Sequence, residues 1–341
     1  MTVVGLDPDA VARWFTSLRI EFQAPLQFQR IGLGQSNLTY RVSDAAGRAW
    51  VLRRPPLGHL LASAHDVLRE ARIIAALADT PVPVPQIIAT TTDSEFSDVP
   101  LVLMEFVDGL VVDTMSVAEA LTPQQRRRIA VDLPHTLAKI HAVDLDEVGL
   151  ADLASHKPYA QRQLKRWAGQ WELSKTRELP DLDDLTRRLA AAAPEQREVS
   201  LVHGDFHLRN LITSPETGQI VATLDWELST LGDPLADMGS LLTYWAEPGE
   251  AVSGDYAPST LEGFPDRAEM TRLYLDETGR DAAALQYWHA LGLWKLAIIA
   301  EGVMRRAMEE PQNKASAGTP VVAWIDARVQ KAREIADAAG F

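Results

Sequence analysis

The sequence predicts an α+β protein in two lobes, a small antiparallel β lobe followed by a larger, mainly helical lobe. The chain has 341 residues, which is long for a single hydrophobic core. Its first third alternates short apolar runs with turn residues, a pattern typical of β-hairpins. Most of the remainder has the apolar spacing of helices. The boundary is expected at Val107-Asp108-Gly109, which gives lobes of residues 1–107 and 108–341.

The first lobe is expected to begin with a helix and to continue as one antiparallel sheet. Asp7-Pro8 is a typical N-cap followed by proline at the first helical position, so a helix is predicted as far as Arg19. Residues 64–77 have apolar side chains at helical spacing and predict a second helix. The extended segments between Gly-, Asp- and Pro-containing turns are 26–31, 38–42, 50–53, 86–90 and 101–106.

The second lobe is predicted to be helical, with one exception. Residues 199–225 alternate short apolar runs with turns, so short strands are expected there. The predicted helices are 123–142, 159–176, 182–193, 234–245, 268–278, 282–308 and 320–338.

Composition excludes several classes of function. The chain has 33 Lys and Arg against 47 Asp and Glu, a net charge of −14, so neither nucleic acid nor an anionic membrane is an expected partner. It has no cysteine, which excludes disulfides, Cys-ligated zinc and thiol catalysis. No signal peptide and no apolar run of about 18 residues is present, so a cytoplasmic protein is expected. Nothing in the sequence indicates an oligomeric state.

The strongest functional signal is the segment His203–Asn210, which reads His-Gly-Asp-Phe-His-Leu-Arg-Asn and lies between two short apolar runs. A further apolar run, 220–224, ends at Asp225. Phosphoryl transfer needs one carboxylate to accept the proton of the attacking hydroxyl, and amide and carboxylate oxygens to hold Mg²⁺ against the nucleotide phosphates. An isolated Asp and Asn would simply cap turns. The two flanking strands and Asp225 favour a phosphoryl-transfer site.

With these residues the sequence resembles the aminoglycoside phosphotransferase-like family, whose hallmark is His-Gly-Asp-x-x-x-x-Asn followed by an apolar strand that ends in Asp. The resemblance implies a bilobal protein-kinase-like fold that uses ATP and Mg²⁺. It implies that Asp205 is the catalytic base and that Asn210 and Asp225 are metal ligands. His203 would shape the loop, and Asp237, which ends the Gly-Asp-Pro-x-x-Asp stretch, would brace it.

His207 receives no role from this resemblance, and a packing or hydrogen-bonding role is expected for it.

A glycine-bearing turn marks the expected nucleotide side. Residues 32–37 read Gly-Leu-Gly-Gln-Ser-Asn and lie between two strands, whereas dinucleotide-binding and Walker loops open a helix. The hairpin could fold over phosphates through backbone N–H groups, with Gly32, Gly34, Ser36 and Asn37 as contacts. An ordinary β-turn is the alternative. The position upstream of the central motif favours the phosphate loop.

Two further segments complete the expected nucleotide site. Arg53 stands where kinases carry a lysine, and Glu70 on the next helix resembles its acidic partner. Arg53 is expected to contact phosphate, although its geometry differs from that of lysine. A solvated arginine on an edge strand is the alternative. Residues 104–109 resemble the inter-lobe hinge, so adenine is expected near the backbone of Glu105 and Val107, unless this is an ordinary edge strand.

The acceptor is predicted from a second resemblance. Residues 225–234, Asp-Trp-Glu-Leu-Ser-Thr-Leu-Gly-Asp-Pro, and residues 294–306 resemble the branch of the family found fused to acyl-CoA dehydrogenases or encoded as separate bacterial proteins. The resemblance implies hydroxy fatty acids or their CoA esters as small-molecule hydroxyl acceptors. Lys295, Arg305 and Arg306 could neutralise such an anion. An amphipathic core helix with solvated basic residues is the alternative.

Two other functions stay open. An aminoglycoside or another small alcohol could be the acceptor, and an aminoglycoside would need an acidic cluster such as Glu247, Glu250 and Asp255. Alternatively, the chain could be a nucleotide-binding pseudokinase that regulates a partner, because Arg53 replaces the usual lysine. Intact Asp205 and its partners argue against the pseudokinase.

Overall fold

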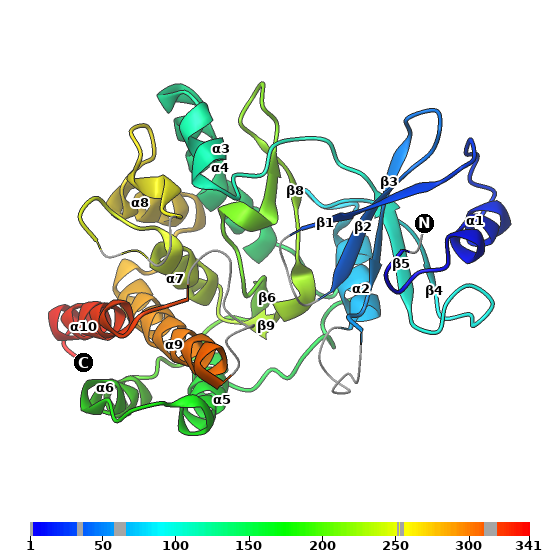
Figure 1. Ribbon diagram of the computed structural model, residues 1–341. Helices are drawn as coiled ribbons and strands as arrows, with labels where there is room; N and C mark the ends of the chain where they lie inside the picture. The colour runs from blue at the N-terminus through cyan, green and yellow to red at the C-terminus, as the bar shows by residue number, and fades with distance from the viewer. Residues whose placement is uncertain (1–2, 33–36, 58–65, 251, 253–255, 310–318) are drawn as a thin grey trace. The chain divides into compact units, whose positions relative to one another are not determined.

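The structure, a computed structural model, describes residues 3–32, 37–57, 66–250, 252, 256–309 and 319–341 (Figure 1). The chain forms two compact units. The first holds Met1–Gly109 together with Val221–Glu227, and the second holds Leu110–Ile220 and Leu228–Phe341. The segment Val221–Glu227 therefore folds with the first unit although it lies outside the range that the sequence predicts for the first lobe.

The first unit contains a five-stranded antiparallel sheet in the order β1-β2-β3-β5-β4. Its two helices are α1 (Pro8–Ser17) and α2 (Val67–Leu77). The five strands confirm the predicted sheet, and their bounds are β1 Gln27–Ile31, β2 Leu38–Ser43, β3 Ala49–Arg54, β4 Ile87–Thr91 and β5 Leu101–Glu105.

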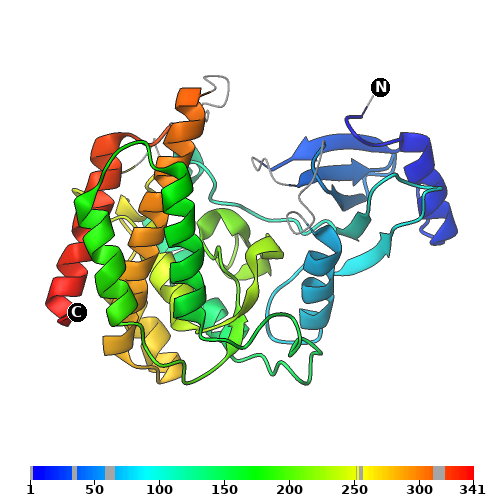
Figure 2. The ribbon, with the colours of Figure 1, turned by 90° about the horizontal axis from the view of Figure 1, so that it is seen from below.

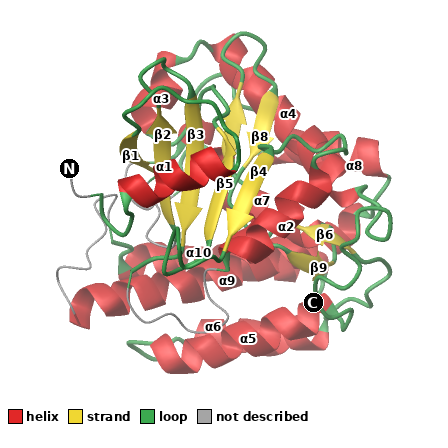
Figure 3. Cartoon of the chain, turned by 90° about the vertical axis from the view of Figure 1, so that its right-hand side faces the viewer, coloured by secondary structure: helices red, strands yellow, loops and turns green. Residues whose placement is uncertain are grey.

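The alternation of side chains along β5 explains how the two helices attach. Successive side chains of a strand point to opposite faces of the sheet. Leu101 and Leu103 pack in the cluster that contains Trp14 and Phe15 of α1, the helix that crosses the sheet in Figure 3. Val102 and Met104 pack instead with Val67 and Ala71 of α2. Each helix therefore covers its own face of the sheet, and α2 lies against β4 and β5.

The second unit is mainly helical, as predicted. Helix α9 packs against α5, α7 and α10, and Figure 2 shows α5, α9 and α10 running alongside one another. Short strands β6 (Ser200–Val202) and β9 (Thr230–Gly232) pair antiparallel. The helices are α3 Met115–Ala120, α4 Pro123–His141, α5 Tyr159–Ser174, α6 Pro180–Ala191, α7 Leu235–Tyr244, α8 Arg267–Thr278, α9 Ala282–Glu309 and α10 Val322–Ala339.

The predicted alternation of short strands and turns after residue 199 is also present. Strand β7 spans Leu211–Thr213, and β8 spans Ile220–Thr223, where the chain passes from the second unit to the first. A single 3₁₀ turn, Leu208–Asn210, precedes β7. Among the helices of the described ranges, none combines the length and the apolar character needed to cross a membrane.

Candidate active site

The catalytic-loop residues lie in the second unit, directly after β6. The Asp205 carboxylate is held from both sides: Oδ2 accepts a hydrogen bond of 3.1 Å from Asn210 Nδ2, and Oδ1 lies 3.3 Å from His207 Nε2. Asn210 Nδ2 also donates to the Asp205 backbone carbonyl at 2.9 Å. The five-residue spacing between Asp205 and Asn210 thus closes one compact turn around the carboxylate.

This environment keeps Asp205 ionised. Burial works against the charged carboxylate, but the hydrogen bond from His207 and the nearby charges of His207, His203 and Lys295 outweigh it and lower the pKa of Asp205 to about 2. An ionised carboxylate on a fixed turn can orient an acceptor hydroxyl and receive its proton.

The loop depends on Gly204. This residue has a φ of +86°, and a Cβ at this position would lie 2.8 Å from the Leu228 carbonyl oxygen. Both the backbone conformation and the close approach require glycine.

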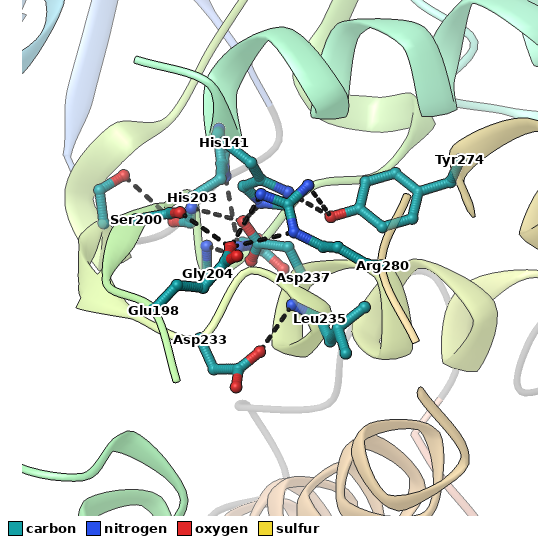
Figure 4. Close-up of polar contacts among 12 residues, drawn as sticks. His141, Glu198, Ser200, His203, Gly204, Asp233, Leu235, Asp237, Tyr274 and Arg280 are labelled. Atoms are coloured by element: carbon teal, nitrogen blue, oxygen red, sulfur yellow. Dashed lines mark hydrogen bonds and ion pairs between the residues drawn. The ribbon is translucent and has the colours of Figure 1, made fainter. Parts of the chain in front are cut away.

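Asp237 at the first turn of α7 holds the loop by its backbone (Figure 4). Its Oδ2 accepts from the His203 N–H at 2.6 Å, and its Oδ1 accepts from the Gly204 N–H at 2.8 Å. Burial alone would raise the pKa of Asp237, but the hydrogen bond from His141 and those from the backbone lower it. These contacts are those expected of a residue that braces the loop.

A buried chain of hydrogen bonds extends from Asp237 to the surface. His141 Nε2 lies 3.3 Å from Asp237 Oδ2, and His141 Nδ1 lies 2.7 Å from the Tyr274 hydroxyl. Arg280 donates to that hydroxyl at 3.2 Å and to Glu198 at 2.8 Å. Burial lowers the pKa of His141, so the ring is neutral. The neutral ring donates from Nε2 to Asp237 and accepts from Tyr274 at Nδ1.

Replacing Asp237 by alanine is expected to destabilise the protein and to lower kcat. The change leaves two backbone N–H groups without their acceptor, so the free energy of unfolding should fall by about 3 kcal/mol. Chemical denaturation and steady-state kinetics measure the two effects. Asp276→Ala, which removes an exposed acid from α8 that pairs with Arg272 at 3.3 Å, is the matched control and should change neither. Unchanged stability in Asp237→Ala would contradict the bracing role.

The first unit contains the predicted partnership of Arg53 and Glu70. Arg53 Nη2 lies 2.9 Å from Glu70 Oε2 and 3.2 Å from Asp225 Oδ1. β3 supplies Arg53, α2 supplies Glu70, and the segment after β8 supplies Asp225. The Asp225 backbone has a φ of +65°, in the left-handed region that non-glycine residues rarely adopt. A single nitrogen of Arg53, Nη2, contacts both Glu70 and Asp225.

The pKa values of both Glu70 and Arg53 are raised in this cluster. Burial raises the pKa of Glu70 to about 7, against the pull of Arg53, and the charges of Asp225 and Glu227 add to the rise. Burial would lower the pKa of Arg53, but Glu70 and Asp225 raise it. Arg53 is thus a permanent cation, whereas Glu70 can take up a proton near neutral pH.

The pKa of Glu70 predicts a pH dependence of stability. Since the pKa of about 7 in the folded state exceeds the ordinary value of 4.5, the folded state binds more protons between these values. The free energy of unfolding should therefore fall as pH rises from about 4.5 to about 7, by up to about 3 kcal/mol. Urea unfolding at several pH values measures this slope. Glu70→Gln should flatten it, whereas Glu95→Gln, at an exposed loop position, should not; an equal slope in Glu70→Gln would contradict the assignment.

The glycine-bearing turn is described at its two ends. Gly32 has a φ of +82°, and Asn37 Nδ2 donates to Glu227 Oε2 at 3.2 Å. This bond joins the turn to the segment that carries Asp225. The predicted contacts Gly34 and Ser36 lie outside the described residues.

The expected hinge residues follow the sheet. Glu105 closes β5, and its N–H donates to the Gln86 carbonyl at 2.9 Å. Val107 lies directly after the strand and is partly buried.

A cavity of about 290 Å³ adjoins the catalytic loop within the second unit. His207, which contacts Asp205, lies in its wall, and its ring packs edge-on against Tyr244 at 5.0 Å. The rest of the wall is mainly apolar and comes from α7, α9, α10 and residues between α7 and α8. Arg209 and Arg328 supply positive charge, and no acidic residue is among the described residues of the wall.

The three basic residues predicted to meet the acceptor lie elsewhere among the described residues. Lys295 lines a second, smaller cavity. Arg305 Nε binds Glu309 at 2.7 Å, and Arg305 also donates to the Leu173 carbonyl. Arg306 is exposed. Within the described chain, none of the three lines the 290 Å³ cavity.

Comparison with known proteins decides the family. The model of the phosphotransferase enzyme family matches residues 27–272, which include the catalytic loop, Asp225 and Asp237. The chain belongs to the phosphotransferase enzyme family. Acyl-CoA dehydrogenase family member 10 of Mus musculus is 35% identical over 92% of this chain and 30% of its own length. The chain spans about a third of the length of the curated relatives that it matches.

Solved structures agree with this membership. A Ralstonia eutropha protein assigned as an aminoglycoside phosphotransferase is 30% identical, with a TM-score of 0.76 over 98% of this chain and 97% of the other. A thermostable aminoglycoside phosphotransferase mutant in a ternary complex with AMP-PNP and hygromycin B has a TM-score of 0.60 and 14% identity, over 97% of this chain and 96% of the other, so it shows the fold alone. The predicted kinase-like α+β fold and the predicted class of small-molecule kinase are thereby confirmed.

The donors of this phosphotransferase suit magnesium and phosphate. The Asp225 carboxylate is 31% exposed, and Asn210, with Nδ2 turned to Asp205, keeps its carbonyl oxygen at the other end of the amide. The described residues contain no group of three or more acidic, histidine or cysteine side chains able to hold a metal. Mg²⁺ in kinases is held by few protein oxygens and is completed by phosphates and water. The buried Nε of Arg53 has no hydrogen-bond partner in the described ranges, and it suits a phosphate oxygen.

Two residues near these groups were not predicted to contribute. Glu227 binds Asn37, and its place two residues after Asp225 was the available signal. Tyr244 lies against His207 from the end of α7, and nothing in the sequence pattern links these two residues.

Proposed function

We propose that this protein transfers the γ-phosphoryl group of ATP to a hydroxyl group of an apolar, anionic small molecule, a hydroxy acid or a hydroxyacyl-CoA. One observation carries the choice of acceptor: the cavity beside the catalytic loop is mainly apolar, contains Arg209 and Arg328, and has no acid among its described residues. The apolar wall suits an acyl chain, and the arginines suit a carboxylate or phosphate group.

Each residue of the loop has a place in this reaction. The bond between the γ-phosphorus and its bridging oxygen breaks, a bond to the acceptor oxygen forms, and the hydroxyl proton moves to Asp205. Asn210 holds the Asp205 carboxylate in position and, with Asp225, would hold Mg²⁺. The metal ion, when bound, supplies charge neutralisation for the phosphates. His203 and Asp237 fix the loop through its backbone.

The first unit would bind the nucleotide. Arg53, held by Glu70, would contact phosphate through its remaining donors, and the backbone after Gly32 would cover the phosphates. Glu105 and Val107 would receive adenine at the end of β5. The AMP-PNP complex of a protein with the same fold supports ATP as donor.

An aminoglycoside is a weaker candidate because its expected acidic contacts are already paired. Glu250 binds Arg267 at 2.6 Å, and Glu247 lies 3.4 Å from the same guanidinium. Burial would raise the pKa of Glu250, but the hydrogen bond and charge of Arg267 lower it, so this carboxylate is committed to its partner. Asp255 lies outside the described residues. The name of the acyl-CoA dehydrogenase relative also favours an acyl acceptor.

The test is ATP consumption with a 4-hydroxyacyl-CoA, the free hydroxy acid and a panel of aminoglycosides. Turnover with the acyl compounds alone is expected, and turnover with the aminoglycosides alone would reject the proposed acceptor. Val303→Phe, which narrows the cavity from α9, should raise KM for the acceptor and leave KM for ATP unchanged. Val322→Phe, at an exposed position of α10, is the control.

A further inference from the structure

Phosphoryl transfer requires positive charge beside the transferred group, because negative charge is spread over its oxygens in the transition state. The cation within the loop itself, Arg209, is directed elsewhere. Its Nε donates to the Asp113 carbonyl at 3.2 Å, and its guanidinium lies 3.7 Å from the centre of the Tyr256 ring. Arg209 is therefore not directed at Asp205, and a cation from another element would add to the charges of Mg²⁺ and Arg53 proposed above.

Helix α9 supplies such a cation in Lys295. This residue lines a small cavity of about 30 Å³ together with Gly204 and Asp237. The Lys295 ammonium lies 5.4 Å from the centre of the Trp167 ring, on α5, which fixes the direction of the side chain. Burial lowers the pKa of Lys295, and the charges of Asp205 and then Asp237 oppose the fall. Lys295 is thus a partly buried residue beside the catalytic loop.

The ammonium has no acidic partner of its own. Within the described ranges, no carboxylate lies at ion-pair distance from Lys295 Nζ, whereas Lys175 has two such partners and Lys331 has one. A partly buried charge without a counterion is less stable than a paired one, and an arriving anion would stabilise it.

We propose that Lys295 is a catalytic residue that contacts the phosphoryl group during its transfer beside Asp205, and that it is not an acceptor-binding residue. The proposal rests on the phosphotransferase function proposed above. Lys295 stays protonated throughout: the acceptor proton goes to Asp205, and the ammonium only stabilises the charge of the transferred group. This role explains why α9 directs a lysine toward Gly204 and not into the acceptor cavity.

Steady-state kinetics of Lys295→Met and Lys295→Arg separate the two roles. Lys295→Met should lower kcat by about 100-fold with little change in KM for ATP or for the acceptor, and Lys295→Arg should recover part of the loss. Lys331→Met removes a partly exposed lysine from α10 and should behave as the unmodified protein. A raised acceptor KM with unchanged kcat in Lys295→Met would reject the proposal in favour of acceptor binding, and unchanged constants would also reject it.

Calorimetry keeps this test separate from that of the proposed function. ADP with Mg²⁺ and aluminium fluoride mimics the transferred group, whereas AMP-PNP mimics bound ATP. Lys295→Met should bind the aluminium fluoride complex at least about 10-fold more weakly and AMP-PNP as before. Equal weakening of both ligands would show a general structural effect and overturn the proposal. If the unmodified protein bound neither ligand, the proposed function itself would be wrong.

Discussion

Replacing Asp205 by asparagine should lower kcat by about 10³-fold, because asparagine cannot accept the proton of the attacking hydroxyl. The amide keeps the size of the carboxylate and one oxygen that can accept from Asn210, so the loop should keep its conformation. Binding of AMP-PNP should therefore be retained. Single-turnover kinetics with labelled ATP and calorimetry with AMP-PNP measure the two quantities.

The control for this variant is Asp233→Asn, a change at the turn before α7 whose carboxylate accepts only from the Leu235 N–H among the described contacts. It should keep most of the activity. If Asp205→Asn bound AMP-PNP and every measurable turnover were unchanged, the pseudokinase alternative would replace catalysis.

Replacing Arg53 by methionine should have the largest effect on stability. Glu70 is 3% exposed and would lose its cation, and removal of one partner of a buried ion pair costs about 3–5 kcal/mol. Protonation of Glu70 should reduce this loss at low pH, since its pKa is already raised to about 7. AMP-PNP affinity should fall as well, because a phosphate contact is lost. Chemical denaturation at two pH values and calorimetry measure these effects.

The double variant Arg53→Met/Glu70→Leu identifies the cause of the instability. It replaces the buried pair by apolar side chains of similar volume, so much of the stability should return while nucleotide binding stays weak. Arg53→Lys keeps the charge and should be milder than Arg53→Met. A double variant no more stable than Arg53→Met alone would show that the ion pair is not the source of the loss.

The sequence was sufficient for most of the architecture because apolar periodicity and turn residues are local signals. The five strands of the sheet and the long helices lie within a few residues of their predicted bounds. Helix α3 and strand β9 were not predicted, because six and three residues are too short for a periodic pattern. Their formation depends on the elements against which they pack.

Some residues of the site are likewise predictable from local sequence spacing, whereas others depend on tertiary packing. Asp205 and Asn210 were predictable because their spacing closes one turn, and Arg53 with Glu70 because a strand is followed by a helix. The contact of His207 with Tyr244 depends on where α7 ends, which no local pattern encodes. The direction of Lys295 likewise depends on the packing of α9 against α5. The sequence pattern does not distinguish Lys295, Arg305 and Arg306 of α9, whereas packing gives each of them different surroundings.

The segment Val221–Glu227 has a consequence for how the protein is made. The first unit includes this segment, yet residues 110–220 are synthesised before it. A nascent chain that ends before Asp225 can bring Arg53 to Glu70 but lacks the second acid of the bridge. Contacts of such large sequence separation form late in folding. The phosphate-contact residues should therefore assemble only after much of the second unit has left the ribosome, and every N-terminal fragment that contains the whole first unit also contains residues 110–220.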